Sequence, residues 1–388
     1  MAGKVEWPVL ARVDDVLSTK HQHPFCTTSS LRGALHPTRA FTSRFFLLYT
    51  GLILHNIAMA DRPPPTVVPR ASRRARLPSF VRLPMLIILN ICLQSALWTG
   101  AENVLSHELG AVSKVPRPGQ EQEGFGELTE PIVRLVSKIA LVSVAWKLRY
   151  DYFDIGALTA VINIPFAFLL TTFYNISLLT AAAHVAIEVI SIALPTYLLR
   201  PIADINNPAV PIRNRYLLNS FQVSWSNTAL AVGVYATVLY SSLQTNWLTI
   251  FLINHFDLPS VELAHDVQAA TFIPKLLVAG YATKAFLLDP AIGAQPETGA
   301  VTPVGPFEPA TATLPQTLKH NFWFFSRRTR TLIQRSAVLS TFLLANTVLR
   351  GATLEGSEIA GSAGYAGVWI LAANICAAWF VWTGDADP

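Results

Sequence analysis

The stretch "LLTAAAHVAIEVISIALPTYLL", from Leu178 to Leu199, decides the fold class. Nearly all of its residues are apolar or small. As a helix it would extend about 33 Å, because each residue adds about 1.5 Å, and this is enough to cross the hydrocarbon core of a bilayer. Its two ionisable residues, His184 and Glu188, are four positions apart and therefore share one helix face. The stretch predicts a transmembrane helix that carries a polar site.

Composition extends this prediction to the whole chain. The chain has 388 residues, of which 52% are hydrophobic and 14% charged, and its mean hydropathy is +0.40. Soluble domains carry about 25% charged residues, so a large soluble core is the weaker alternative. The basic pI of about 9.1 could indicate nucleic acid. The basic residues cluster beside apolar runs, however, which is typical of membrane orientation, so we expect no nucleic-acid partner.

Eight apolar runs have lengths close to that of a membrane span. They are residues 85–101, 132–146, 153–173, 178–199, 222–243, 269–288, 336–348 and 361–382. The second run contains Arg134 and Lys138 and the seventh is short, so these two are the least typical. The runs predict an all-α polytopic transmembrane bundle of about eight spans, with both ends in the cytosol.

Basic residues are distributed unevenly between the two sides of this predicted topology. Sixteen lie on the cytosolic side and five on the other, namely Lys114, Arg117, Arg134, Lys138 and Arg350. Such an excess is what the positive-inside rule predicts for cytosolic loops. The loop 244–268 has no Lys or Arg, so we expect it outside or in a lumen.

The N-terminal region contains a possible internal start. Met59 precedes a proline- and arginine-rich stretch, and we expect the functional chain to begin there, with residues 1–58 a doubtful N-terminal extension. The alternative is a genuine ordered or membrane-surface segment. The remaining parts are predicted as a basic cytosolic segment (59–84), the first six spans (85–288), a cytosolic region (289–334), and the last two spans with a short tail (335–388).

The cytosolic region 289–334 has two different halves. Its first half is rich in Pro, Thr, Ala and Gly and predicts an irregular linker. Its second half, "LKHNFWFFSRRTRTLIQ", combines aromatic and basic residues, among them Trp323, Phe324, Arg327, Arg328 and Arg330. It predicts an interfacial segment that contacts anionic lipid. Alternatively, it is a basic flank that orients the seventh span.

Polar residues within the spans are the candidate site. Glu188 is expected near mid-membrane, with His184 nearer the outer side, and an ionised carboxylate at that depth needs a partner. Asn163 and Pro165 in the preceding span predict either a local helix break beside Glu188, as transporters use, or an ordinary proline kink. Lys275 is the expected cationic partner if the helices are adjacent. The group is either a proton-linked or substrate-binding site, or a His184–Glu188 hydrogen bond that holds helices together.

A second pattern concerns helix packing. Ala229, Gly233, Thr237 and Ser241 recur at four-residue spacing in the run 222–243. Small residues at this spacing let another helix approach closely, either within the bundle or at an oligomer seam.

Motifs for established chemistries are absent from the sequence. It has three cysteines, Cys26, Cys92 and Cys376, with no CxxC or Cys/His cluster, so we expect no zinc site or disulfide framework and no cofactor. No GxSxG, Walker loop, HExxH or GxGxxG occurs. An enzyme acting on lipids would have to use outer residues such as His255, Asp257 and His265.

Four stretches carry a family resemblance. "RPPPTVVPRASRRARLPSFVRLP", "LTTFYNISLLTAAAHVAIEVISIALPT", "IRNRYLLNSFQVSWSN" and "PATATLPQTLKHNFWFFSRRTRTL" resemble an uncharacterised family of multi-pass membrane proteins from filamentous ascomycete fungi. The resemblance covers roughly residues 59–384 and brings no activity, substrate or catalytic residue with it. It implies a eukaryotic secretory-pathway or organelle membrane.

Three functions are compatible with these patterns. The first is a small-molecule or lipid transporter with a polar site between the third and fourth spans. The second is a structural or scaffolding membrane protein with an oligomeric or membrane-protein partner, and the third is a membrane-embedded lipid enzyme. We expect an integral protein of an endomembrane, such as the endoplasmic reticulum, or of the plasma membrane. The patterns favour a protein that is not an enzyme.

Overall fold

A computed structural model describes residues 78–113, 129–212, 214–258, 269–294, 311–317, 325 and 327–384. All of these belong to one compact unit, residues 75–388. Several predictions therefore fall outside the described residues. They are the N-terminal extension 1–58 with Met59, the basic segment up to residue 77, most of the Pro-rich linker, Trp323, Phe324 and His265.

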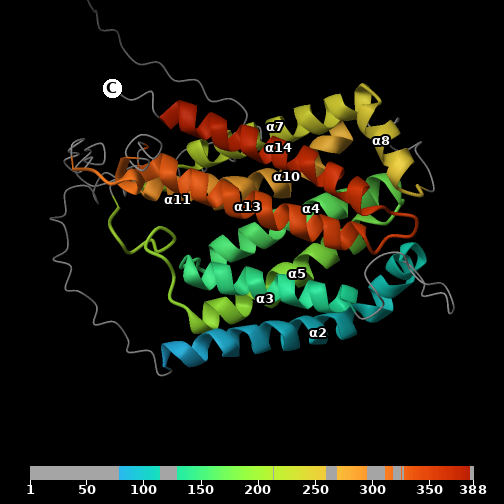
Figure 1. The fold of residues 1–388 in the computed structure, drawn as a ribbon, viewed down its shortest axis with the longest axis horizontal. Helices are drawn as coiled ribbons and strands as arrows, with labels where there is room; N and C mark the ends of the chain where they lie inside the picture. The colour runs from blue at the N-terminus through green and yellow to red at the C-terminus, as the bar shows by residue number, and fades with distance from the viewer. Residues whose placement is uncertain are drawn as a thin grey trace, which may run out of the picture. The chain divides into compact units, whose positions relative to one another are not determined.

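Long helices occupy all eight predicted runs (Figure 1). They are α2 (Ser79–Val112), α3 (Thr129–Lys147), α4 (Tyr152–Phe173), α5 (Leu178–Leu199), α7 (Phe221–Gln244), α10 (Ala269–Thr283), α13 (Arg327–Gly351) and α14 (Ile359–Gly384). Shorter elements are α6 (Arg215–Asn219), α8 (Trp247–His255), the π-helix η1 (Lys284–Leu288) and α11 (Asp289–Gly293). Among the described residues the only β-pairing is an isolated antiparallel bridge between Ser113 and Leu354. The all-α fold class is confirmed.

Six stretches of these helices are long and apolar enough to cross a bilayer. They are Val81–Glu102, Tyr152–Phe173, Leu178–Leu199, Phe272–Gly293, Arg327–Gly351 and Ile359–Trp382. The chain is thus compatible with a multi-pass membrane protein. α3 and α7 are not among the six, so eight crossings and two cytosolic ends stay predictions.

α4 is the central helix of the bundle. Seventeen of its 22 residues are buried, and it packs against α5, α13 and α10. α5 in turn packs on α2, while α14 and α10 pack on α7. Figure 1 shows this order, with α2 and α3 on one side of α4 and α7 and α14 on the other. Asn163 on α4 and His184 and Glu188 on α5 are consequently buried inside the protein.

Side-chain caps set the beginnings of α4 and α5. The Asp151 carboxylate accepts a hydrogen bond from the backbone N–H of Asp154 at 2.9 Å, and the Ser177 hydroxyl accepts one from the N–H of Thr180 at 3.2 Å. Each cap satisfies one of the N–H groups that a helix leaves without a partner in its first turn. The caps fix the register of the two helices that carry Asn163 and Glu188.

α13 begins earlier than predicted. It runs without interruption from Arg327, so residues 327–334 are part of the long helix and not a separate interfacial segment. Arg328 Nη2 donates to the backbone oxygen of Phe380 in α14 at 3.0 Å, which places a positive charge at a helix C-terminus. Residues 289–293, expected in the linker, form α11. Contact of Arg327, Arg328 and Arg330 with anionic lipid stays a prediction.

The predicted stripe of small residues does not pack within the bundle. Ala229, Gly233, Thr237 and Ser241 are all exposed on α7, and a methyl group added at Gly233 would meet no atom within 4 Å. The close helix contact of α7 lies on its opposite face. There a Cβ on Gly280 of α10 would come within 2.4 Å of a Val232 methyl carbon. An oligomer seam at the stripe stays a prediction.

Candidate functional site

Glu188 is the centre of a buried polar cluster. Its carboxylate accepts hydrogen bonds from Gln94 Nε2 of α2 at 3.0 Å and from Lys138 Nζ of α3 at 3.1 Å. The guanidinium of Arg350, from α13, pairs with the same carboxylate. Four helices therefore meet at one side chain. The two cations supply the partners that a buried carboxylate requires.

The cations of this cluster are more exposed than the carboxylate. The side chain of Glu188 is 6% exposed, whereas those of Lys138 and Arg350 are 30% and 16% exposed. A molecule that enters beside the cluster would therefore meet positive charge before it meets the carboxylate.

A large cavity of about 710 Å³ lies beside the cluster. It is bounded by α2, α3, α5, α13 and one residue of α4. Its polar and charged lining is Gln94, Ser95, Ser113, Arg134, Ser137, Lys138, His184, Glu188, Asn346, Arg350 and Thr353. Ser113, Pro131 and Thr353 stand at or near the ends of helices, so the cavity extends to the end of the bundle where α2 ends and α3 begins. Its size suits a small molecule or a lipid headgroup.

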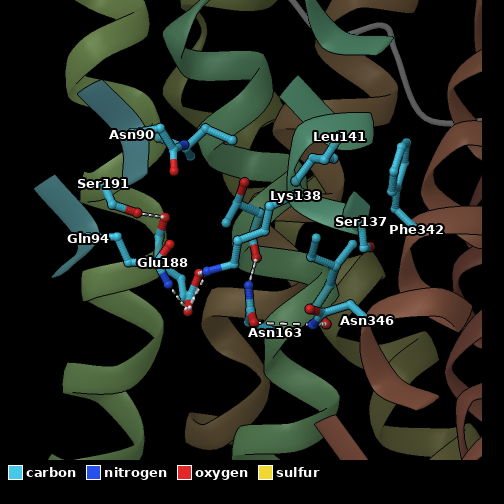
Figure 2. A pocket seen from close by; sticks show the side chains of 13 residues that line it. Asn90, Gln94, Ser137, Lys138, Leu141, Asn163, Glu188, Ser191, Phe342 and Asn346 are labelled. Carbon is cyan, nitrogen blue, oxygen red and sulfur yellow. Dashed lines mark hydrogen bonds and ion pairs between the residues drawn. The ribbon is translucent and has the colours of Figure 1, made fainter. Parts of the chain in front are cut away.

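A smaller cavity of about 30 Å³ continues from the cluster (Figure 2). Lys138 and Glu188 point toward each other across it from α3 and α5. Asn346 of α13 donates to the side-chain oxygen of Asn163 at 3.1 Å and to the backbone oxygen of Ile162 at 2.7 Å. A cavity of this size and polarity can hold one or two water molecules.

His184 faces the large cavity with both ring nitrogens unused. It is 1% exposed, and neither nitrogen has a hydrogen-bond partner in the described part of the chain. The ring packs against Trp98 and Phe166, with centroids 5.6 and 5.7 Å away. Buried polar groups are normally hydrogen-bonded, so this histidine calls for an explanation. The predicted His184–Glu188 hydrogen bond is absent.

A second buried ion pair lies toward the other end of α13. Arg335 donates to both carboxylate oxygens of Asp154, at 2.8 and 3.0 Å, and to the backbone oxygen of Phe286 at 2.9 Å. Its guanidinium also lies over the rings of Tyr150 and Phe286, at 4.7 and 5.0 Å. Burial raises the pKa of the Tyr150 hydroxyl to about 12, so this side chain stays neutral. The guanidinium of Arg335 therefore makes three hydrogen bonds and two contacts with aromatic rings.

The π-helix adds a third ion pair at this end of the bundle. Lys284 Nζ lies 2.9 Å from Asp289 Oδ2 and donates to the Ser224 hydroxyl of α7 at 3.0 Å. Short π-helical segments within α-helices often occur at functional sites. Lys284 is buried, whereas its partner Asp289 is 20% exposed.

The predicted site residues are divided between different places. Glu188, His184 and Asn163 line the connected cavities. Lys275 does not join them, because it lines a separate, largely apolar hollow between α4 and α5. Its expected pairing with Glu188 is wrong, since Lys138 and Arg350 take that role. α4 continues through Pro165 without a break.

The residues named for an enzyme do not form a cluster in the described part of the chain. His255 Nδ1 lies 2.7 Å from Glu358 Oε2, which links α8 to the start of α14. Within the described residues there is no group of three or more His, Cys, Asp or Glu that could hold a metal ion.

Sequence reasoning missed four contributors to the site, namely Gln94, Lys138, Asn346 and Arg350. A signal for two of them existed. Arg134, Lys138 and Arg350 were three of the five basic residues on the wrong side of the predicted charge distribution, and all three line the large cavity. Three of the basic residues that depart from the positive-inside rule therefore line the large cavity.

Comparison with known proteins found no match to a family model, a curated protein or a solved structure. The resemblance to a fungal membrane-protein family accordingly stays a prediction. Function has to be argued from the site alone.

Proposed function

We propose that this chain is an integral membrane transporter for a small molecule or a lipid, and that its substrate binds in the cavity beside Glu188. The observation that carries the proposal is a cavity of about 710 Å³ within apolar helices, lined by ionisable side chains. Such residues within membrane helices are costly and generally mark substrate or ion pathways. The proposed setting is an endomembrane or the plasma membrane.

The two ends of α13 differ in a way that supports transport. Arg350 is at the large cavity, and Arg335 is fifteen residues away, about 22 Å along the helix. Between them lie Asn346, which is bonded to α4, and the fully buried Leu339. The large cavity thus lies toward one end of the bundle, while the buried Leu339 and the Asp154–Arg335 pair separate it from the other end.

Transport requires that the contacts of Glu188 and the Asp154–Arg335 pair break and form again in turn. Substrate in the cavity would compete for Lys138 and Arg350, which weakens their hold on Glu188. Movement of α13 against α4 and α5 would then separate Arg335 from Asp154 and open the second end. Rocking of one part of a bundle against another around a fixed site is the usual basis of alternating access.

Cysteine labelling from each side of the membrane tests this proposal. Ser95 lines the cavity, so Ser95→Cys is made in a chain whose three native cysteines are replaced. The reagent is a membrane-impermeant maleimide applied to right-side-out and inside-out vesicles. A transporter should be labelled in both, because the cavity faces each side in turn. The matched control is Gly233→Cys, on the exposed face of α7, which should not react from either side. Labelling of Ser95→Cys in only one orientation would contradict transport.

A scaffold is the second candidate, and the exposed stripe on α7 favours it. Ala229, Gly233, Thr237 and Ser241 face outward, where they could admit a helix of another copy or of a membrane-protein partner. The hydroxyls of Thr237 and Ser241 donate to backbone oxygens of their own helix, so the stripe needs no polar partner. A scaffold predicts one-sided labelling of Ser95→Cys and loss of self-association or partner capture in Gly233→Leu.

A further inference from the structure

We infer that the large cavity selects anions, specifically a ligand with a carboxylate or phosphate group, whose charge lies beside Lys138 and Arg350. This inference deepens the proposed function, because it names the substrate class of the same site. It rests on the charge, exposure and geometry of the lining residues.

The charge of the lining is the first argument. Lys138 and Arg350 both pair with Glu188, which is the one carboxylate among the described residues of the lining. One carboxylate carries a single negative charge and does not neutralise both of these cations. An anion beside them would offset the remaining positive charge.

The accessible part of the cluster is the second argument. Glu188 is covered, while Lys138 and Arg350 keep part of their surface open. Each of the two cations has N–H donors beyond those that contact Glu188, because an ammonium has three and a guanidinium five. Guanidinium groups match carboxylate and phosphate oxygens in a bidentate arrangement. Among the described residues of the lining, a cationic ligand would find no exposed carboxylate.

His184 is the third argument and is independent of the charges. A neutral imidazole offers one donor and one acceptor, and both are buried at the cavity wall without a partner in the described residues. A phosphate or carboxylate oxygen can accept from the donor, and a ligand hydroxyl can donate to the acceptor. Trp98 and Phe166 beside it provide an apolar wall for the uncharged part of the ligand.

In this arrangement the Glu188 carboxylate competes with the ligand for Lys138 and Arg350. Its carboxylate occupies part of the cationic surface in the absence of ligand, and an incoming anion has to share Lys138 and Arg350 with it. Removing this carboxylate should therefore strengthen anion binding, whereas removing a cation should weaken it. A purely structural cluster predicts that both changes act in the same direction.

Thermal stabilisation of the purified full-length chain in detergent measures these effects, since a ligand that binds the native state raises Tm. The probes are inorganic phosphate, citrate, dihexanoyl phosphatidic acid and, as the zwitterionic control, dihexanoyl phosphatidylcholine. We expect an anionic probe to raise Tm and the choline lipid to leave it unchanged. A response to phosphate or citrate identifies a soluble anion, and a response to phosphatidic acid alone identifies a lipid headgroup.

Single substitutions distinguish a change in anion affinity from a change in the stability of the fold. Lys138→Gln and Arg350→Gln should each weaken anion binding about tenfold, while Glu188→Gln should tighten it several-fold. Lys275→Gln, in the separate apolar hollow, is the matched control and should bind as the unmodified chain does. If Glu188→Gln does not fold, the comparison of Lys138→Gln with Lys275→Gln still decides, because only the first removes a cation of the cavity.

Two results would overturn the inference. One is an equal response to the choline lipid and to phosphatidic acid, and the other is no response to any anion in both the unmodified chain and Glu188→Gln. Neither bears on two-sided labelling of Ser95→Cys, so transport of a different substrate class would survive. Conversely, anion binding with one-sided labelling would retain the anion site and remove transport.

Discussion

The two ends of α13 use the same chemistry for different purposes. At one end, Arg335 and Asp154 face each other with two hydrogen bonds, and a backbone oxygen and two aromatic rings complete the surroundings of the guanidinium. At the other end, one carboxylate is shared by Lys138, Arg350 and Gln94 beside a large cavity. The first pair is enclosed and saturated, and the second is open and has an excess of cations.

This difference shows what an ion pair in a membrane bundle can indicate. A pair whose charged groups use their hydrogen-bonding capacity on each other and on the backbone holds helices together and leaves few donors for a ligand. A pair with exposed cations beside a cavity has unused donors, which makes binding its natural role. Burial of charge alone does not separate the two cases, because Asp154 and Glu188 are buried to nearly the same extent.

Asp154→Asn should produce the largest loss of stability. It leaves the buried guanidinium of Arg335 without a counter-charge, and breaking a buried pair in this way costs about 3–5 kcal/mol. The free energy of unfolding is measured by SDS titration in mixed micelles. Asp204→Asn, at an exposed loop position, is the matched control and should change it by less than about 0.5 kcal/mol. A loss below about 1 kcal/mol at Asp154 would show that the closed end is not held by this pair.

Glu188→Gln should cost less, about 1–3 kcal/mol, the range for leaving a polar partner unsatisfied. The substitution keeps the shape of the side chain, and the freed cations can be solvated from the cavity. The same titration measures the effect, with Glu102→Gln on the exposed surface of α2 as the control. If Glu188→Gln costs as much as Asp154→Asn, the cluster is as enclosed as the other pair, and the contrast between the two ends fails.

Local patterns predicted the helices well but not their contacts. Hydrophobic runs placed all eight long helices, and Glu188, His184 and Asn163, named together from the sequence, line connected cavities. A hydrophobic run shows that a segment forms a helix in apolar surroundings, but it does not show which other helices that segment contacts. Glu188 is separated in the chain from its partner Lys138 by 50 residues and from Arg350 by 162 residues. No local pattern could therefore pair them.

Two expectations that were left open depended on these contacts. Lys275 was a partner for Glu188 only if the two helices were adjacent, and the small residues on α7 could pack either within the bundle or at an oligomer seam. The structure turns the stripe outward and uses Gly280 of α10 for the close contact with α7. Spacing identifies which residues share a helix face, but the direction of that face depends on how all the helices pack.

The double variant Asp154→Asn/Glu188→Gln has the smallest expected signal and tests the relation between the two ends most directly. Sites that are well separated in a rigid protein give additive losses within about 0.3–0.5 kcal/mol. If α13 moves as a transporter requires, Asp154→Asn favours the state in which the contacts of both ends are already broken. Glu188→Gln then has less left to remove, and the double loss should fall short of the sum by more than about 0.5 kcal/mol. Additive losses would mean that α13 does not move relative to the other helices. The Glu188 cluster would then bind its ligand without a rearrangement of the bundle.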